Sequence, residues 1–572
     1  MFRTQYLDYA QLTSQLKTWA DAHPGFVKLS SIGKSREGRE LWMLTLGERP
    51  DEIRPAVWVD GNMHASEFCG SSVSLAIAED VINIHVGKQD IGKLPAHMAA
   101  AVKSHLFYIV PRISPDGAEA VLKTGRYVRS HPADSRADKG RSYWQNGDID
   151  GDGQAGYMRQ QCEDGEAVEL KDENGKRFGN GVLVPRMPED EGPFFRVFPE
   201  GHIENFSGGH IPAHNYMADS QTDYNRNFPH QWSAEHEQMG AGEFPGSEPE
   251  TRAILEFHAA HPNIYAWINY HTFGGCFLRP SGDEPDSKMD QQDLAVFKQV
   301  EVWAKEFTGY PMVSGYHDFQ YEPGVPSRGV ITGYAYHQRG ALSYCVELWD
   351  IFTQAGMAQE PKRKMFVDLY TQLTREDLRK LAKWDAEKNQ SRVFRPWRKF
   401  THPQIGEVEL GGIDLRVGVS NPSYEQLNEV CQQHSATTLR VASLLPQLDV
   451  QVVKQEALGD GITRIDLIIK NAGYLGTHGI NSAKKLAHVE PLRLTVEGEG
   501  VSLAAPGDAV TQIGHLEGWG RGPYGGFQIF APWTRGNANE RSVSLVVKGK
   551  GKMKVRVGSA RVGFTNSEVA VE

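Results

Sequence analysis

The sequence predicts an α/β fold, with a mixed central sheet flanked by helices and a C-terminal all-β, sandwich-like domain. Over residues 1–395, apolar runs typical of buried strands alternate with segments of helical periodicity. From residue 448 onward, short strands of alternating polarity are separated by glycines. We therefore expect an α/β domain at 1–395, a linker and helix at 396–447, and the β domain at 448–572.

The elements of the first domain follow one another in regular order. Helices are expected where apolar residues recur at helical spacing, at residues 7–23, 72–84, 249–258, 292–307 and 362–388. Strands are expected where short apolar runs occur, at residues 27–32, 41–46, 56–60, 106–111, 264–270 and 342–348. This alternation is the pattern of a sheet covered by helices.

The rhythm breaks at residues 118–222, which are rich in Gly, Asp, Arg and Pro and show weak periodicity. Because the periodicity is weak, we expect an irregular insertion here. So long an irregular segment within a domain is usually functional or stabilised by a cofactor. Beyond it, residues 422–445 suggest a helix, and strands are expected at 463–469, 492–496, 543–547 and 555–557.

Composition excludes several classes of protein. Lys and Arg number 61 against 72 Asp and Glu, which gives a net charge of −11. With no long basic run, this chain is a poor candidate for binding nucleic acid. No apolar stretch approaches the roughly 20 residues of a membrane span, so no membrane partner is expected. The five cysteines imply no disulfide framework.

The compartment follows from weaker signals. The first residues have no apolar segment of the signal-peptide type. Together with the few cysteines, this favours a cytoplasmic protein, although a secreted mature form after signal removal would have the same sequence. The oligomeric state is left open.

The sharpest motif is an H-x-x-E pair directly after the strand at 56–60. His64 and Glu67 place an imidazole and a carboxylate three residues apart, where both face one way in a turn or helix. Both are good zinc ligands, and a catalytic zinc takes three protein ligands plus a water. The motif alone is weak, because such pairs also occur as hydrogen-bonded surface residues.

Two further residues end or interrupt later strands. His271 closes the apolar run at 264–270, at the strand end where open α/β folds place their sites, although a lone His is often structural. Glu347 interrupts the buried pattern of 342–348, and a buried carboxylate is costly unless it is paired or functional. Beside a metal-bound water it could act as a general base; the alternative is a structural ion pair.

A third segment, residues 222–228, carries an Arg between two amides. Arg226 with Asn225 suits bidentate recognition of a carboxylate, although a surface loop is the ordinary interpretation of such a segment.

In this combination and order the chain resembles the carboxypeptidase A-type zinc metallopeptidase family. The shared motifs are the strand followed by H-x-x-E, an S-P-D-G turn, the N-R-N segment, the strand ending in His and a strand-borne Glu in V-E-L. The stretch from Tyr9 to Leu46 also looks like the opening of that family. The resemblance covers roughly residues 5–390.

The resemblance implies a zinc metallocarboxypeptidase that hydrolyses C-terminal peptide bonds through a zinc-bound water. It implies one zinc ion held by His64, Glu67 and His271, with Glu347 as the general base. Asn225 and Arg226 would clamp the C-terminal carboxylate of a peptide substrate. The family also has an arginine that stabilises the oxyanion, for which Arg129 is the first candidate and Arg159 the second.

The chain departs from the family where the substrate side chain would bind. The tyrosine that caps the substrate has no counterpart at Val325, and Tyr321 is the nearest tyrosine. The specificity pocket should be lined near Thr332 and Gly333, neither of which is charged or bulky. A preference for basic residues therefore has no support.

The insertion carries a possible calcium loop. Asp148, Asp150 and Asp152 form a D-x-D-x-D-G run, in which alternate carboxylates can converge on one ion. The twelfth position is Arg159 and not Glu, so this is not a standard EF-hand. The alternative is an Asp/Gly turn with local hydrogen bonds. If Arg159 points to the zinc site, the Asp-rich loop would position it there.

Two other functions remain open from the sequence. A zinc amidase or deacylase acting on cell-wall peptides or N-acyl amino acids would keep the zinc and the base but would differ in what Arg226 binds. A non-catalytic peptide- or glycan-binding protein would not need His64, Glu67, His271 and Glu347 together.

Overall fold

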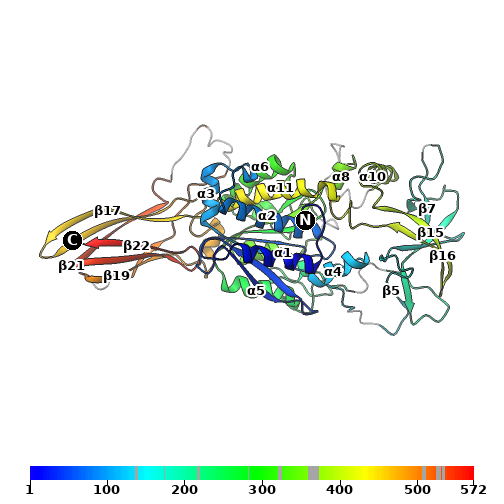
Figure 1. Cartoon of the computed structure of the whole chain (residues 1–572), viewed down its shortest axis with the longest axis horizontal. Helices are drawn as coiled ribbons and strands as arrows, with labels where there is room; N and C mark the ends of the chain where they lie inside the picture. The colour runs from blue at the N-terminus through cyan, green and yellow to red at the C-terminus, as the bar shows by residue number, and fades with distance from the viewer. Residues whose placement is uncertain are drawn as a thin grey trace.

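A central sheet of eight strands organises the first part of the chain (Figure 1). The computed structural model describes residues 1–134, 139–172, 174–214, 220–280, 282–319, 325–357, 373–504, 510–522, 530 and 535–571. The strand order is β1-β2-β4-β3-β11-β14-β12-β13. The bounds are β1 (Val27–Lys34), β2 (Glu40–Leu46), β3 (Ala56–Gly61), β4 (Leu106–Val110), β11 (Ile264–Thr272), β12 (Cys276–Arg279), β13 (Met312–Ser314) and β14 (Leu342–Leu348).

The middle of the sheet is parallel and its edges are mixed. Strands β4, β3, β11 and β14 run parallel, whereas β2 joins β4 and β12 joins β14 in antiparallel pairs. The carboxyl ends of parallel strands meet at one edge, which is where open α/β sheets bind ligands. The ends of β3, β11 and β14 therefore lie side by side. The predicted mixed α/β sheet is confirmed.

Both faces of the sheet are buried, as the continuous apolar runs require. Alternate residues of β3 belong to different cores, with Val57 and Val59 in one and Trp58 in the other. The helices are α1 (Tyr9–Ala22), α2 (Phe68–His85), α3 (Ala96–Ser104), α4 (Pro115–Thr124), α5 (Pro249–Ala260), α6 (Gln291–Thr308), α8 (Ile351–Gln354), α10 (Arg375–Lys388) and α11 (Tyr424–Ala442). In the described part of the chain, none of them is long and apolar enough to cross a bilayer.

The insertion is a second sheet and not the irregular segment that its composition predicts. Its order is β15-β16-β6-β9-β7-β8, and β5 pairs with β10 beside it. The bounds are β5 (Tyr143–Asn146), β6 (Tyr157–Gln161), β7 (Ala167–Glu169), β8 (Leu183–Pro185), β9 (Phe194–Pro199), β10 (Gly201–Glu204), β15 (Phe394–His402) and β16 (Gly406–Ile413). Strands β15 and β16 thus lie almost entirely in the linker predicted at 396–447, and β16 pairs directly with β6.

Helix α11 returns to the α/β body after this excursion. It packs against α2 and α6, and its Leu439 and Cys431 belong to the same core as β3 and β11 (Figure 1). The predicted helix at 422–445 is present, but it is part of the layer that covers the central sheet.

The C-terminal region is all β, as predicted. Its strands are β17 (Leu448–Gly459), β18 (Ile462–Asn471), β19 (Leu492–Leu503), β20 (Val510–Gly514), β21 (Glu540–Ser559) and β22 (Gly563–Val571). Alternate residues of β18, including Ile465, Leu467 and Ile469, enclose a separate apolar core. This region lies at the opposite end of the molecule from the insertion sheet (Figure 1).

Candidate metal centre

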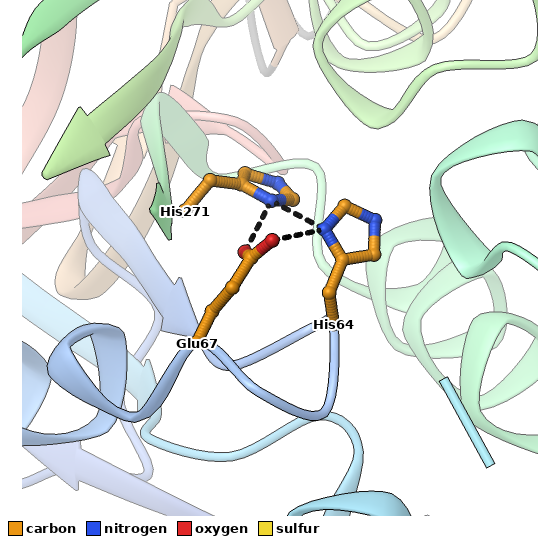
Figure 2. Close-up of side chains that lie close together, drawn as sticks. All are labelled: His64, Glu67 and His271. Atoms are coloured by element: carbon orange, nitrogen blue, oxygen red, sulfur yellow. Dashed lines mark hydrogen bonds and ion pairs between the residues drawn. The ribbon is translucent and has the colours of Figure 1, made fainter. Parts of the chain in front are cut away.

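Three side chains converge at the carboxyl edge of the central sheet (Figure 2). Nδ1 of His64 lies 2.8 Å from Oε1 of Glu67, and Nδ1 of His271 lies 2.9 Å from Oε2 of the same carboxylate. The two Nδ1 atoms are 3.0 Å apart. These distances show that donor atoms from two distant segments meet at one point. All three side chains are buried.

The local sequence shapes the loop that carries His64 and Glu67. Strand β3 ends at Gly61, and the side-chain amide of Asn62 then donates to the carbonyls of His64 and Ala65. A Cβ at Gly61 would lie 2.5 Å from the backbone of Gly70 in the first turn of α2. Glycine at this position therefore lets α2 begin close to the strand, so that the loop stays short and tightly held.

The donor set fits a zinc ion. Two imidazole nitrogens and one carboxylate are ligands that zinc prefers, and a catalytic site uses three of them. Nitrogen atoms that face each other at 3.0 Å are compatible with a shared cation between them. Burial raises the pKa of Glu67, but the two imidazoles more than offset this, so its pKa lies below the ordinary value. The carboxylate is thus held in its ligating, ionised form.

Asp223 connects His64 to Arg129 and was not singled out as a site residue from the sequence. Its Oδ1 accepts from Nε2 of His64 at 3.1 Å, and its Oδ2 accepts from Nε and Nη2 of Arg129 at 3.0 and 2.9 Å. Burial raises the pKa of Asp223, but the charge of Arg129 leads the attractions that hold it well below the ordinary value. Its only sequence signal is its place just before the Asn225–Arg226 pair.

The first predicted oxyanion residue, Arg129, lies beside the metal cluster. Its Nη1 is 3.7 Å from Oε1 of Glu67, and its backbone carbonyl accepts from the amide of Ala65 in the ligand loop. Asp223 anchors the other side of the guanidinium. Arg129 is therefore positioned to present positive charge at the edge of the cluster.

A buried polar chain orients His271. Nε2 of His271 contacts Oδ1 of Asn269 at 2.5 Å, and the amide of Asn269 donates to Asp60. Asp60 also accepts from the indoles of Trp58 and Trp267 at 2.6 and 2.9 Å, and burial raises its pKa to about 6. Such outer partners set the orientation of ligating histidines. Asn269 could have been suspected, because it precedes His271 by two strand positions and shares its face.

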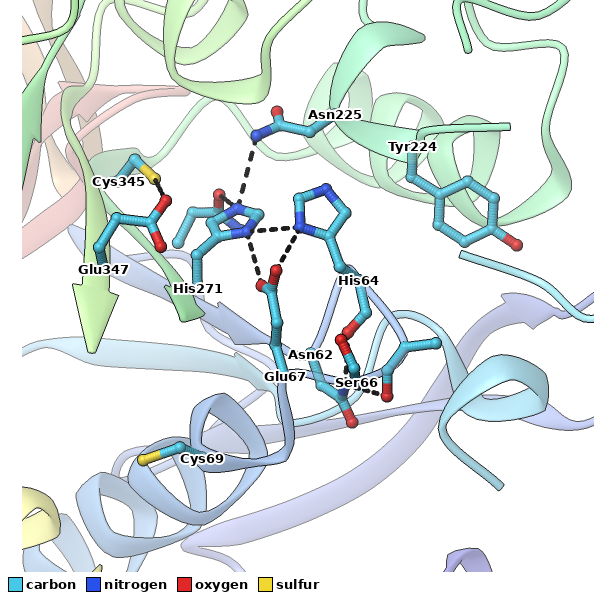
Figure 3. Close-up of polar contacts among 12 residues, drawn as sticks. Asn62, His64, Ser66, Glu67, Cys69, Tyr224, Asn225, His271, Cys345 and Glu347 are labelled. Carbon is cyan, nitrogen blue, oxygen red and sulfur yellow. Dashed lines mark hydrogen bonds and ion pairs between the residues drawn. The ribbon is translucent and has the colours of Figure 1, made fainter. Parts of the chain in front are cut away.

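Glu347 lies next to the cluster through strand register. It pairs with His271 across β11 and β14, and Figure 3 shows it on the side of His271 that faces away from His64. Burial raises the pKa of Glu347 to about 8. Among the described residues, Sγ of Cys345 makes a long contact of 3.9 Å with the Glu347 carboxyl group. A carboxyl group with a pKa near neutral is suited to proton transfer.

Asn225 lies against His271, and Arg226 follows it in the chain. The amide nitrogen of Asn225 is 3.5 Å from Nε2 of His271 (Figure 3), and its oxygen accepts from the amide of Ile331. Arg226 is 8% exposed and donates to the carbonyl of Asn225. No described carboxylate lies within ion-pairing distance of Arg226, so this guanidinium differs from Arg129 in lacking an acidic partner among the residues described.

The predicted specificity residues are next to this segment. Thr332 and Gly333 form the short helix α7 (Ile331–Gly333), whose first amide is the one held by Asn225. A Cβ at Gly333 would lie 2.9 Å from the ring of His230. Tyr321, the predicted capping residue, lies outside the described residues.

The structure places Arg159 in the insertion sheet and not at the cluster. On β6, its guanidinium pairs with Glu169 and Glu409 at 2.7 Å each and lies over the rings of Phe195 and Trp397. All of these partners belong to the insertion sheet. The predicted oxyanion role of Arg159 is therefore not supported. The reason is that β16, far along the chain, supplies its partner.

The Asp148, Asp150 and Asp152 carboxylates do converge, as the sequence predicts. However, Asp148 accepts from the amides of Gly151 and Gly153, and Arg398 pairs with Asp150 and Asp152 at 2.9 and 2.7 Å. An arginine from β15 therefore provides the positive charge that a calcium ion would otherwise supply.

Comparison with known proteins identifies a family model described as zinc carboxypeptidase, which matches residues 12–168 and 210–368. These ranges are more than half of the chain and include His64, Glu67, Arg226, His271 and Glu347. Residues 447–570 match a second model, described as a domain of unknown function (DUF8731).

Individual relatives match over shorter stretches. A zinc carboxypeptidase of Saccharothrix mutabilis subsp. capreolus is 34% identical over 126 residues, which are 22% of this chain and 27% of that protein. Carboxypeptidase M of Mus musculus is 33% identical over 115 residues, 20% of this chain and 24% of that protein. The chain thus spans about a quarter of the length of these relatives.

Among solved structures, similar chains include two at 18% identity. Thrombin activatable fibrinolysis inhibitor aligns over 67% of this chain and 74% of its own, with a TM-score of 0.38. Carboxypeptidase A from Helicoverpa armigera aligns over 68% and 74%, with a TM-score of 0.37.

Proposed function

The chain belongs to the zinc carboxypeptidase family, and from this premise we propose that it is a metallocarboxypeptidase that releases the C-terminal residue of a peptide. The single observation that carries the proposal is the convergence of His64, Glu67 and His271 within 3.0 Å, beside a buried Glu347. A structural ion-pair network would need neither two facing imidazole nitrogens nor a separate carboxyl group with a raised pKa.

His64, Glu67 and His271 are the residues that would hold the metal. Zinc, when bound, supplies Lewis-acid chemistry that polarises a carbonyl and lowers the pKa of water. The protein contributes the orientation of these ligands. Asp223 holds the ring of His64, and Asn269 holds the ring of His271, so each Nδ1 is directed inward.

Glu347 is the proposed general base. Its carboxylate would take a proton from the attacking water and pass it to the leaving amine. A raised pKa of about 8 keeps the group able to exchange a proton near neutral pH. A nearby cation would lower this pKa and so favour the ionised carboxylate. Arg129, anchored by Asp223, would stabilise the negative charge that develops on the carbonyl oxygen.

Arg226 is the proposed anchor for the substrate's C-terminal carboxylate. Its side chain is largely buried, it follows Asn225 in the chain, and no described carboxylate lies within ion-pairing distance of it. A planar guanidinium next to an amide matches the two oxygens of a carboxylate. Uncharged Thr332 and Gly333 would then select a neutral side chain.

The test compares peptides that differ only at the C-terminus. We expect metal-loaded protein to cleave a peptide with a free carboxylate and to lose at least 10²-fold in kcat/KM on the C-terminal amide, since the amide cannot pair with Arg226. E347Q should lower kcat by about 10²–10⁴-fold with unchanged zinc content.

The other outcomes identify the alternatives. Equal cleavage of the amidated peptide, or cleavage only of cell-wall or N-acyl substrates, would favour the amidase or deacylase. Absence of both zinc and hydrolysis would contradict the proposal and favour a binding protein. Mass spectrometry of products and metal analysis of the same samples provide both measurements.

A further inference from the structure

Asn421 joins the loop before α11 to the backbone on both sides of Glu67. Its side-chain nitrogen donates to the carbonyl of Ser66 at 2.7 Å, and its oxygen accepts from the amide of Cys69 at 2.9 Å. The nitrogen also donates to the carbonyl of Arg416 within its own loop, at 2.8 Å. Asn421 is fully buried, and its bond with the amide of Cys69 is shielded from water at both ends.

The contact with Cys69 replaces a missing helix cap. Glu67 is the N-cap residue of α2, a position whose side chain normally accepts from one of the first free amides of the helix. The carboxylate of Glu67 instead faces the two histidines and makes no capping bond. Asn421, from a segment remote in sequence, supplies the acceptor that Glu67 cannot.

The same loop also holds the strand that carries the proposed base. The carbonyl of Gly418 accepts from the indole of Trp349 at 2.9 Å, two residues beyond Glu347. Arg416 donates to two carbonyls in the last turn of α4. The loop at 414–421 therefore contacts the backbone on both sides of one proposed metal ligand and the side chain of Trp349, two residues beyond the proposed base.

We propose that Asn421 is a positioning residue for Glu67, supplied from outside the stretch that matches the family model. The matched stretch ends at residue 368. Because the ligand carboxylate is not available to cap its own helix, its backbone direction depends on Asn421. This inference rests on the proposed metal role of Glu67, and it makes the loop at 414–421 part of the catalytic unit.

The test measures zinc affinity by competition with a chelator in full-length protein. We expect N421D to raise the Kd for zinc by about 10–100-fold, the range found for residues that support metal ligands. N421D keeps the size of the side chain and the acceptor for Cys69, but it places a carboxylate against the carbonyl of Ser66. N421A removes all three bonds and should act in the same direction.

Asn389 provides the matched control. It is a fully buried amide that donates to Asp385 and to the carbonyl of Val417, so it holds the same loop without a hydrogen bond to Ser66 or Cys69. We expect N389A to lower the Tm of metal-free protein as N421A does, but to change the Kd for zinc by less than about threefold. The visible absorption of cobalt-substituted protein should change in N421D and not in N389A.

The outcomes separate the inference from the proposed function. If wild-type protein binds zinc and N421D binds it equally well, or if N389A weakens zinc as much as N421A does, Asn421 has only a structural role. If wild-type protein binds no zinc, the proposed metal centre itself fails. Should N421A not fold, N421D and its cobalt spectrum still decide the question.

Discussion

Asp223 supports two of the proposed site groups at once. One carboxylate oxygen holds His64 and the other holds Arg129, so a proposed ligand and the proposed oxyanion group share one anchor. A buried carboxylate in this position is stabilised by the positive charges of Arg129 and Arg226 and by its hydrogen bond with His64. The two functions should therefore weaken together when Asp223 changes.

We expect D223N to raise the Kd for zinc by about 10–100-fold and to lower kcat/KM as well, because a neutral amide holds His64 less firmly and leaves the charge of Arg129 unbalanced. Chelator competition and peptide hydrolysis measure the two effects. D116N is the control, since Asp116 is a buried carboxylate that pairs with Arg39 and Ser35 and has no described hydrogen bond to a residue of the cluster. Equal loss of zinc affinity in both variants would contradict the role given to Asp223.

At the scale of elements, the insertion sheet has its own stabilising centre. Arg159 on β6 joins Glu169 on β7 and Glu409 on β16, and two aromatic rings cover its guanidinium. Loss of one partner leaves buried charge without compensation. This arrangement explains the 4% exposure of the Arg159 side chain without any part in catalysis.

R159A should therefore destabilise the fold and spare the chemistry. We expect the free energy of unfolding of the insertion sheet to fall by about 2–3 kcal/mol, less than for a fully buried pair because Glu169 and Glu409 are partly exposed. Urea unfolding measures this change, and kcat/KM should stay within threefold. R129A is the comparison, with kcat/KM expected to fall by about 10²-fold or more. The reverse pattern would restore a catalytic role for Arg159.

The elements also show where sequence patterns suffice. The strand expected at 342–348 has those bounds in β14, and the helix expected at 292–307 is α6 within one residue at each end. Long apolar runs and long amphipathic helices are local signals. The three-residue strands β7 and β8 carry too few residues to show a period, and they form because partners from other segments pair with them.

At the scale of the whole molecule, α11 links the stability of the body to pH. His434 on α11 is fully buried among the rings of Tyr270, Phe277 and Tyr310, directly behind the strand that ends in His271. Burial lowers the pKa of His434 to about 3, so the ring is neutral in the fold. Below pH 6.5 the unfolded chain gains a proton that the folded chain does not.

Stability should therefore fall as the pH drops from about 6.5 toward 3, and His434 should contribute about 2 kcal/mol of that loss between pH 7 and pH 5. H434L removes the titrating group while it keeps an apolar side chain, so its unfolding free energy should depend less on pH by this amount. Urea unfolding at the two pH values measures the difference. The exposed His210 is the control, and an equal effect of H210L would contradict the assignment.

The candidate metal centre could be predicted from the sequence because its residues carry local signals. His64 and Glu67 are three positions apart in one loop, while His271 and Glu347 occupy the ends of apolar runs, and parallel strands bring such ends together. Arg226 was found for the same reason, through its two flanking amides. What these residues share is that their chemistry is unusual for their local surroundings.

The supporting residues could not be predicted in this way. Asp223, Asn421 and Arg159 are ordinary polar residues in loops or short strands, and their roles come from partners 94 to 355 positions away. Hydrogen bonds act over about 3 Å in space and not along the chain, so only the folded structure shows that Asn421 caps the helix of Glu67 or that Glu409 holds Arg159. The motifs of the sequence therefore pointed to the family and to the proposed reacting groups, whereas long-range packing determined what holds those groups in place.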